Sequence, residues 1–347
     1  MINLKKSNNV NTYKIRCNQE YLLNKINNIY KTTIETSHTY ENILFMNHNN
    51  FTDIPEEIEI LNKIPIHKLH LQNNKLLIIS PELCKLYNLR YLDLSYNELL
   101  SIPPEIGNLI HLQTLNLGNN RIQSLPQEIG NLINLQKLNL SKNNLTNIPQ
   151  ELCNLVNLYN LDLSQNNLTS IPQELGNLIN LHTLNLSFNM ISSFSKELCY
   201  LKTLQDLNFG YNKLVNIPLE ISNLIHLRIL MLNNNLLEII PDEILKLTFL
   251  TRLSLYKNKL TNFPNLLNFL NYLEIDDTSY KINNITFDTE ILIFSRLFED
   301  TQYTQSTPYE ISNLPLTLKY LYLKKKYKEH NNLSKIRLPY GCQIIFY

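Results

Sequence analysis

The sequence predicts an α/β solenoid, in which stacked repeats each give one strand to a parallel sheet and one short helical segment to the opposite side. Two observations predict this fold. Asparagines recur at a spacing of 23 residues without one slip, and leucines hold the same places around each of them, as in the segment 89–99. The nine asparagines of this register are Asn74, Asn97, Asn120, Asn143, Asn166, Asn189, Asn212, Asn235 and Asn258.

A Leu-x-x-Leu-x-Leu segment stands before each asparagine, and Leu89, Leu92 and Leu94 fill it before Asn97. The second and third leucines alternate with polar residues, which is the period of a strand with one face buried. One such strand per repeat gives a parallel ladder with leucines on its inner face.

The chain then crosses to the next strand through an Ile-Pro-x-Glu segment, for example residues 148–151. Proline donates no ladder hydrogen bond and presets φ, so it fits the segment that leaves the strand. We expect short helical or 3₁₀ turns here, such as residues 126–132.

Each register asparagine lies where the chain turns out of the strand. Its amide offers donors and an acceptor to backbone groups that the bend leaves unpaired, so we interpret the nine residues as a structural ladder. Ten positions after the asparagine, Cys84, Cys153 and Cys199 fill a slot that holds Gly107, Gly130 and Gly176 in other repeats, which indicates packing residues.

The regular array spans residues 41–278, with about ten or eleven repeats. Residues 1–40 are predicted to hold a disordered tail and a capping helix, with Asn18 as its N-cap and Leu22, Leu23, Ile26, Ile29 and Tyr30 at helical spacing. Residues 279–347 are expected to hold degenerate repeats and a C-terminal cap. There, two Leu-Pro frames that begin at Leu314 and Leu338 predict two further strands.

The net charge is +1, with 31 basic and 30 acidic residues, so nucleic acid is an unlikely partner. No run reaches the length of a membrane-spanning segment, and residues 1–10 lack the apolar core of a signal peptide. Asn139 and Asn185 begin glycosylation sequons on predicted strands, where glycans would obstruct the sheet. Together with the unclustered cysteines, this predicts a soluble intracellular protein of the cytoplasm.

The unit Leu-x-x-Leu-x-Leu-x-x-Asn-x-Leu-x-x-Ile-Pro-x-Glu-Ile-Gly-Asn-Leu, complete over residues 112–135, resembles the leucine-rich repeats of intracellular Ras-suppressor and scribble-like scaffold proteins. This resemblance covers about two thirds of the chain. It implies a right-handed curved horseshoe that binds other proteins through its concave face, often in signal transduction. The terminal Leu-Pro strands are similar to repeat variants of bacterial effectors and of amoebal or giant-virus proteins.

Specificity then sits in the residues that point outward from the sheet, at six, four and two positions before each asparagine, with a rim residue just before it. Aromatic residues, Met and Arg are enriched at binding hot spots, and they gather in the late repeats. The predicted protein-binding residues are Phe188, Tyr211, Arg228, Ile229, Met231, Arg252, Tyr256 and Lys257. We call them the late patch.

A second candidate surface, the early patch, comprises Lys68, His70, Tyr91, Asp93 and Tyr96. Elsewhere the central column four positions before the asparagine is uniform, and we expect its side chains to hydrogen-bond along the ladder. That column holds Asp93, Asn116, Asn139, Asp162, Asn185 and Asn208.

The sequence contains no glycine-rich phosphate loop, no His-Glu-x-x-His motif and no Cys-x-x-Cys pair. His67 and His70 lack a third metal ligand nearby, and the lysines between Lys324 and Lys328 fit a solvated loop better than a targeting signal. We therefore expect no enzyme activity, no cofactor and no metal.

The leading hypothesis is a non-enzymatic scaffold that binds one or more protein partners. The alternative is an adaptor or regulatory subunit of an enzyme complex, such as a ubiquitin ligase substrate receptor or a phosphatase regulator, docking through residues 1–40 or 279–347. A ligase with its own catalytic cysteine would depend on Cys342, which occupies a strand-core position in the Leu-Pro frame, and this hypothesis is disfavoured.

Overall fold

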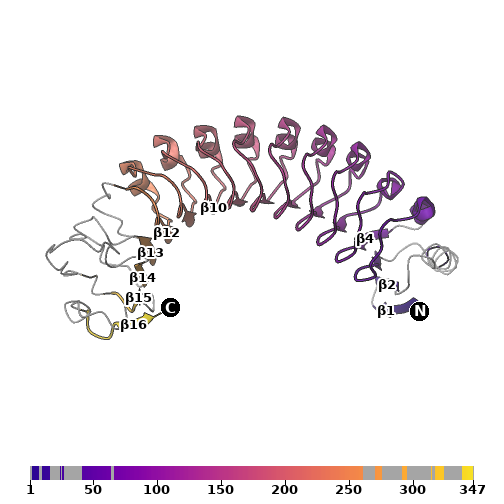
Figure 1. Ribbon diagram of the computed structural model, residues 1–347, viewed down its shortest axis with the longest axis horizontal. Coiled ribbons are helices and arrows are strands. Elements are labelled where there is room, and N and C mark those ends of the chain that lie inside the picture. Colours follow the sequence, from indigo (N-terminus) through magenta and orange to yellow (C-terminus); the bar gives the residue numbers. More distant parts are fainter. Residues whose placement is uncertain are drawn as a thin grey trace, which may run out of the picture. The chain divides into compact units, whose positions relative to one another are not determined.

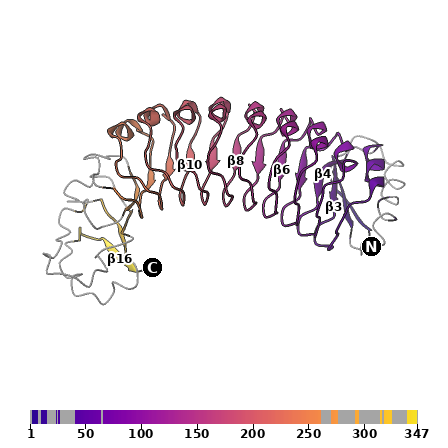
Figure 2. The same cartoon turned by 45° about the horizontal axis from the view of Figure 1, so that its top comes forward.

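The computed structural model describes residues 2–7, 10–15, 24, 26, 41–63, 66–260, 270–275, 291–294, 314, 317–323 and 338–346. The chain divides into two compact units, Met1–Leu184 and Asn185–Tyr347. Within each unit, strands line one face and short 3₁₀ helices line the opposite face (Figures 1 and 2). The predicted solenoid with one strand per repeat is confirmed.

In the first unit the strands pair with their neighbours in chain order. They are β1 (Ile2–Ser7), β2 (Val10–Ile15), β3 (Glu41–Phe45), β4 (Ile66–His70), β5 (Tyr91–Asp93), β6 (Thr114–Asn116), β7 (Lys137–Asn139) and β8 (Asn160–Asp162), and β9 (Thr183–Asn185) lies at the division of the units. The 3₁₀ helices are η2 (Glu56–Lys63), η3 (Leu83–Lys85), η4 (Pro104–Asn108), η5 (Gln127–Asn131), η6 (Gln150–Asn154) and η7 (Gln173–Asn177).

The second unit continues the same alternation. Its strands are β10 (Asp206–Asn208), β11 (Ile229–Met231), β12 (Arg252–Ser254), β13 (Tyr272–Ile275), β14 (Ile291–Phe294), β15 (Tyr320–Leu323) and β16 (Gln343–Phe346), and its helices are η8 (Lys196–Tyr200), η9 (Leu219–Asn223) and η10 (Asp242–Lys246). Strands β15 and β16 lie where the two Leu-Pro frames predict them.

The parallel register follows the sequence period. Leu115 of β6 pairs with Leu138 of β7, and Leu230 of β11 pairs with Leu253 of β12, each 23 residues further on. All four leucines are at most 1% exposed. A repeat on its own could not bury these side chains, so the core exists only because neighbours stack.

The prediction of a disordered N-terminal tail is wrong. Strands β1 and β2 form an antiparallel hairpin, and β2 pairs in parallel with β3. This hairpin covers the first edge of the sheet, where unpaired backbone groups would otherwise face water. Of the predicted capping helix, Asn24 and Ile26 are described and helical, with Ile26 fully buried, and its other residues lie outside the described part of the chain.

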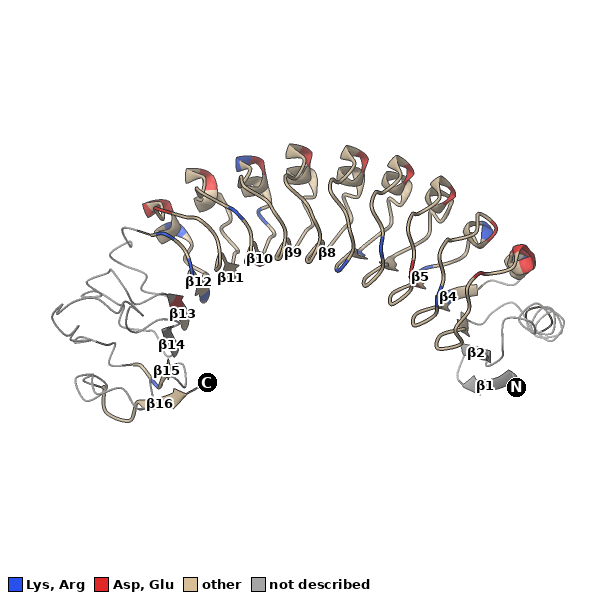
Figure 3. Ribbon diagram, in the orientation of Figure 1, with Lys and Arg blue, Asp and Glu red and all other residues tan. Residues whose placement is uncertain are grey.

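Proline sets the start of most of the 3₁₀ helices. Pro126, for example, is the N-cap of η5 with φ −71° and ψ 150°, an extended conformation that ends the strand side of the repeat. A glutamate follows in the first turn, as Glu128 does in η5. Acidic residues accordingly form a row along the 3₁₀ face in Figure 3, near the positive helix ends.

The slot shared by glycine and cysteine is a close contact between repeats. A Cβ on Gly107 would lie 2.7 Å from the carbonyl oxygen of Glu128. A Cβ on Gly130 would collide with the carbonyl oxygen of Glu151. Cys84, Cys153 and Cys199 are buried and free, as predicted, and burial raises the pKa of each thiol to about 12. Cys17 and residues 324–328 lie outside the described residues.

Candidate binding surface of the sheet

The register asparagines complete the turns of the repeat before them. The Oδ1 atom of Asn143 accepts a hydrogen bond of 3.0 Å from the backbone N–H of Ile122, while its Nδ2 atom donates to the carbonyls of Leu117 at 2.9 Å and Leu140 at 3.0 Å. Asn235 makes the same three kinds of contact in the second unit. The amides are buried and their bonding capacity is used within the protein, so they offer little to a ligand.

The residue before each asparagine has a left-handed backbone. Tyr96, Phe188, Tyr211 and Lys257 have φ between 54° and 58°, a region that costs roughly 1–2 kcal/mol for side chains other than glycine. The hydrogen bonds of the adjacent asparagine hold the turn in this conformation. The rim side chains are therefore presented outward, at the edge where the strands end.

Within the late patch, four residues form what we call the rim cluster: Phe188, Tyr211, Tyr256 and Lys257. The rings of Phe188 and Tyr211 stack with centroids 4.0 Å apart and an angle of 10° between planes. The hydroxyls of Tyr211 and Tyr256 lie 3.2 Å apart, and the ammonium of Lys257 lies 5.8 Å from the Tyr256 ring centre. Phe188 is nevertheless 46% exposed and Tyr211 37% exposed.

The other four residues, Arg228, Ile229, Met231 and Arg252, form what we call the arginine group. Ile229 of β11 pairs with Arg252 of β12, and the Arg252 guanidinium carbon lies 4.7 Å from the ring centre of Tyr272. Burial raises the pKa of Asp206, on the neighbouring strand, and the two arginines act against this shift.

The late patch thus has two parts with different chemistry. The rim cluster is aromatic and lies beyond the ends of the strands, whereas the arginine group is cationic and lies on and before the strands. Both parts lie in the second unit, and Gly210 directly precedes Tyr211 of the rim cluster. A partner that contacts both parts would cross the sheet along the strand direction.

The rings of the early patch lie in a row across β3, β4 and β5. The His70 ring stacks on Phe45 with centroids 4.3 Å apart and lies 4.9 Å from the ring of Tyr91, whose hydroxyl donates to Asp93 at 3.2 Å. Burial lowers the pKa of His70 and raises that of Tyr91 to about 12. These contacts hold His70, Tyr91 and Asp93 against one another, whereas Tyr96 of the same patch is 55% exposed.

The central column hydrogen-bonds within its own repeat, and the expectation of bonds along the ladder is wrong. The Oδ1 atom of Asp162 accepts from the backbone N–H of Ser164 at 2.9 Å and from its hydroxyl at 2.6 Å. Asn139 accepts from the Ser141 N–H in the same way. An Asp or Asn side chain that accepts from the backbone N–H two residues later forms an Asx turn, and this turn ends the strand locally.

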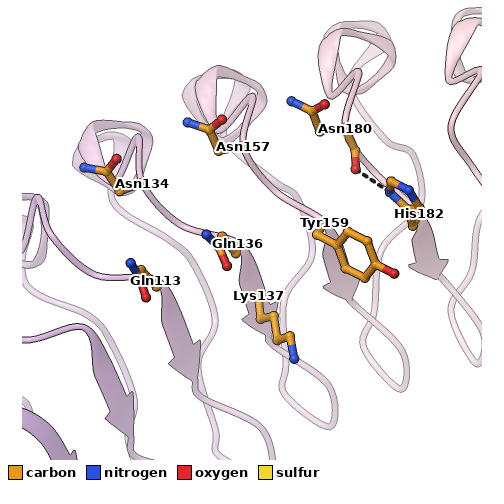
Figure 4. Close-up of a pocket in the computed structure, with 8 residues that line it drawn as sticks. All are labelled: Gln113, Asn134, Gln136, Lys137, Asn157, Tyr159, Asn180 and His182. Carbon is orange, nitrogen blue, oxygen red and sulfur yellow. Dashed lines mark hydrogen bonds between the residues drawn. The ribbon is translucent and has the colours of Figure 1, made fainter.

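Sequence reasoning missed a hollow of about 560 Å³ at the edge where strands β6 to β9 begin. Five side-chain amides line it, and Figure 4 shows them in successive repeats beside Lys137, Tyr159 and His182. The amides belong to Gln113, Asn134, Gln136, Asn157 and Asn180. Their signal was present in the sequence, since Asn134, Asn157 and Asn180 also stand 23 residues apart.

Two kinds of site are not found among the residues that the structure describes. No group of three or more His, Cys, Asp or Glu side chains is placed to hold a metal ion. No helix in that part of the chain is long and apolar enough to cross a membrane.

The comparisons with known proteins agree with the geometry. The family model of the leucine-rich repeat region matches residues 68–216. A leucine-rich repeat protein of Leptospira interrogans is 26% identical, with 96% of this chain and 100% of that chain covered and a TM-score of 0.50. No curated protein matches the chain.

Two plant receptors are also similar in structure. The ectodomain of the Arabidopsis thaliana receptor kinase GASSHO1/SCHENGEN3, solved with CASPARIAN STRIP INTEGRITY FACTOR 2, is 25% identical with a TM-score of 0.68; 90% of this chain and 39% of that chain are covered. The plant peptide hormone receptor RGFR1, solved with RGF2, is 27% identical with a TM-score of 0.65; 88% and 50% are covered. The chain thus spans half or less of these receptors' length. With its 23-residue frame, its strand and 3₁₀ alternation and these matches, the chain is a leucine-rich repeat protein.

Proposed function

We propose that this chain is a non-enzymatic scaffold that binds a protein partner through the sheet face of its late repeats, at the late patch. The observation that carries the proposal is the rim cluster, where two stacked aromatic rings remain substantially exposed to solvent. Stacked rings lose little conformational entropy on binding, because their rotamers are already restricted. Exposed aromatic residues next to arginines have the composition of interaction hot spots.

The similar plant receptors support a protein or peptide as the ligand class, since both were solved in complex with a named partner. The late patch supplies apolar ring surface for anchoring and three cationic groups for orientation. Such a division is typical of interfaces in which a few anchors supply most of the affinity.

We also propose an intracellular location and a role in signalling. The three buried free cysteines support the location, because secreted proteins more often pair their cysteines. The sequon residue Asn139 supports it as well, since it lies on strand β7 and its Oδ1 atom accepts a hydrogen bond from the Ser141 N–H. Fractionation of cells that express the tagged full chain tests this point, and recovery from the medium with a glycan attached would contradict it.

Affinity purification with mass spectrometry tests the binding proposal. The full chain is compared with the triple variant Tyr211→Ala, Met231→Ala, Arg252→Ala. We expect the triple variant to lose the main partner while it keeps its urea midpoint.

The matched control is a triple variant of the second unit's exposed residues on its other faces, Tyr200→Ala, Leu219→Ala and Ile239→Ala, which are 53%, 62% and 61% exposed. This control is expected to keep the partner. If the late-patch triple variant retains every partner of the native chain, the proposed surface is wrong.

A further inference from the structure

The hollow at the start edge of the first unit has unused hydrogen-bonding capacity. We call it the start-edge hollow. In the described part of the chain, no side-chain hydrogen bond involves the amides of Gln113 and Gln136, the ammonium of Lys137 or the hydroxyl of Tyr159. Polar groups of a structural surface can be satisfied by water, but here they gather around one shallow depression. Its volume of about 560 Å³ lies within the usual range for sites that hold a small ligand.

Three asparagines fix the depression's geometry. The Nδ2 atoms of Asn134, Asn157 and Asn180 each donate a hydrogen bond of 2.8 Å to the carbonyl of the residue 24 positions earlier. Each amide is therefore held by the preceding repeat, and its Oδ1 atom remains as an oriented acceptor. A row of fixed acceptors, one per repeat, matches a ligand with donors at repeated intervals.

An aromatic wall closes one side of the hollow. The rings of Tyr159 and His182 stack with centroids 4.3 Å apart, and the His182 Nδ1 atom lies 2.7 Å from the carbonyl oxygen of Asn180. Because a carbonyl oxygen can only accept, this contact orients the imidazole with Nδ1 as the donor. Tyr159 is 46% exposed, so part of its ring is open to a ligand (Figure 4).

The lining of the hollow consists mostly of neutral amides and holds no cluster of charges. Lys137 is the one charged side chain among the residues that line it, and the lining contains no carboxylate. A nucleic acid would need several cations to replace its counterions, and a metal would need clustered anionic or imidazole ligands. Amides serve as both donors and acceptors, which suits hydroxyl groups that also do both.

The repeat spacing distinguishes a sugar chain from an extended peptide. Adjacent parallel strands lie about 4.8 Å apart, whereas an extended peptide advances about 3.3 Å per residue, so peptide groups would fall out of register with successive amides. The length of one pyranose residue is close to the strand spacing, and its C–H face packs against an aromatic ring. We propose that the start-edge hollow binds a neutral oligosaccharide, with Tyr159 under one ring and the amides on the hydroxyls of adjoining rings.

The test uses the full chain and three neutral probes, cellotetraose, chitotetraose and maltotetraose, in saturation-transfer NMR followed by calorimetric titration. A glycan array that includes neutral and charged oligosaccharides and a displayed dodecapeptide library run in parallel. We expect at least one neutral oligosaccharide to bind. The Tyr159→Ala variant should weaken its Kd by about tenfold or more, and Gln136→Ala by a smaller factor, in line with about 1.4 kcal/mol per tenfold change.

Two variants separate ligand contact from misfolding. Tyr159→Phe keeps the ring and should retain binding within about threefold, since tenfold would correspond to a lost anchor. Tyr200→Ala removes an exposed tyrosine of η8 and should leave binding unchanged. The urea midpoint of each variant is measured beside the native chain.

The proposal is overturned if no neutral oligosaccharide binds at millimolar concentration. It is also overturned if binding survives Tyr159→Ala, if only charged glycans bind, or if the library yields peptides that need Tyr159 while the sugars do not bind. The triple variant Tyr211→Ala, Met231→Ala, Arg252→Ala, which lacks the late patch, should keep sugar binding. The failure of one proposal therefore does not imply the failure of the other.

Discussion

The strands of the first unit and those of the second share one inner frame and differ in what they show to solvent. In β6 to β8 the central column holds Asn116, Asn139 and Asp162, each accepting a hydrogen bond from the residue two positions later. In β11 the same column holds Met231, which has no such acceptor. At Met231 the second unit thus lacks the turn contact that Asn208 of β10 still makes, and it gains an apolar surface residue. The comparison teaches that packing fixes the frame, while the outward columns are free to serve binding.

The largest effect is expected from breaking the frame itself. Asn143→Ala leaves the Ile122 N–H without its acceptor and two buried carbonyls without a donor, which should lower the free energy of unfolding by about 3 kcal/mol. Urea denaturation measures this. The neighbouring Asn144 is exposed, and Asn144→Ala should stay within about 0.5 kcal/mol of the native chain. Equal losses from both variants would refute the structural role of the ladder.

A swap at Met231 sharpens the comparison between the units. Met231→Asn restores the residue type of the early central column, so the new Oδ1 atom can accept from the N–H of residue 233. We expect stability to hold or rise slightly, while the Kd for the partner found by affinity purification weakens by about tenfold. Calorimetry and urea midpoints are measured on the same samples. Unchanged affinity would remove Met231 from the proposed surface.

The turn contact of the first unit has a smaller predicted contribution. Asp162→Ala removes the acceptor for the Ser164 N–H and hydroxyl and should cost about 1 kcal/mol of unfolding free energy. Asn160→Ala, on the same strand, is the control and should be nearly neutral. A neutral result at Asp162 would mean that water replaces its contacts without loss.

The smallest effect is a pH dependence in the early patch. Burial lowers the pKa of His70 below its ordinary value of 6.5; Asp93 acts to raise it and Lys68 to lower it. The unfolded state therefore binds more protons just below pH 6.5, so stability falls as pH falls through that window. His70→Phe, which keeps a ring between Phe45 and Tyr91, should reduce the loss between pH 7 and pH 5. Replacing the exposed His111 with Gln should not, and an unchanged loss in His70→Phe would show another group to be responsible.

Sequence periodicity predicted the strands, the 3₁₀ crossovers and the buried cysteine slot, because each follows from local alternation or from a fixed place in a 23-residue period. It also placed the late patch on outward positions, but it could not show that the patch has two parts. That division depends on where the rings of Phe188 and Tyr211 come to rest.

Other features could not follow from the pattern of the array. The N-terminal hairpin pairs residues 2–7 with 10–15, and nothing periodic marks these residues. The start-edge hollow was readable only in part, since the spacing of Asn134, Asn157 and Asn180 is visible while the stacking of Tyr159 on His182 is a tertiary contact. Side-chain partners within a repeat and between repeats also look alike in sequence, which is why the bonds of Asp162 were assigned wrongly.

The backward reach of the register asparagines makes the array directional. A backbone N–H in each repeat donates its hydrogen bond to the side-chain amide of an asparagine 21 residues later. The Ile122 N–H donates to Asn143, and the Leu214 N–H donates to Asn235. During synthesis the newest coil on the ribosome therefore stays incomplete until its successor emerges. Truncation from the C-terminal side removes the acceptors of backbone N–H groups in a repeat that remains. Truncation from the N-terminal side removes only the donors to asparagine amides that remain. The two truncations are therefore not equivalent.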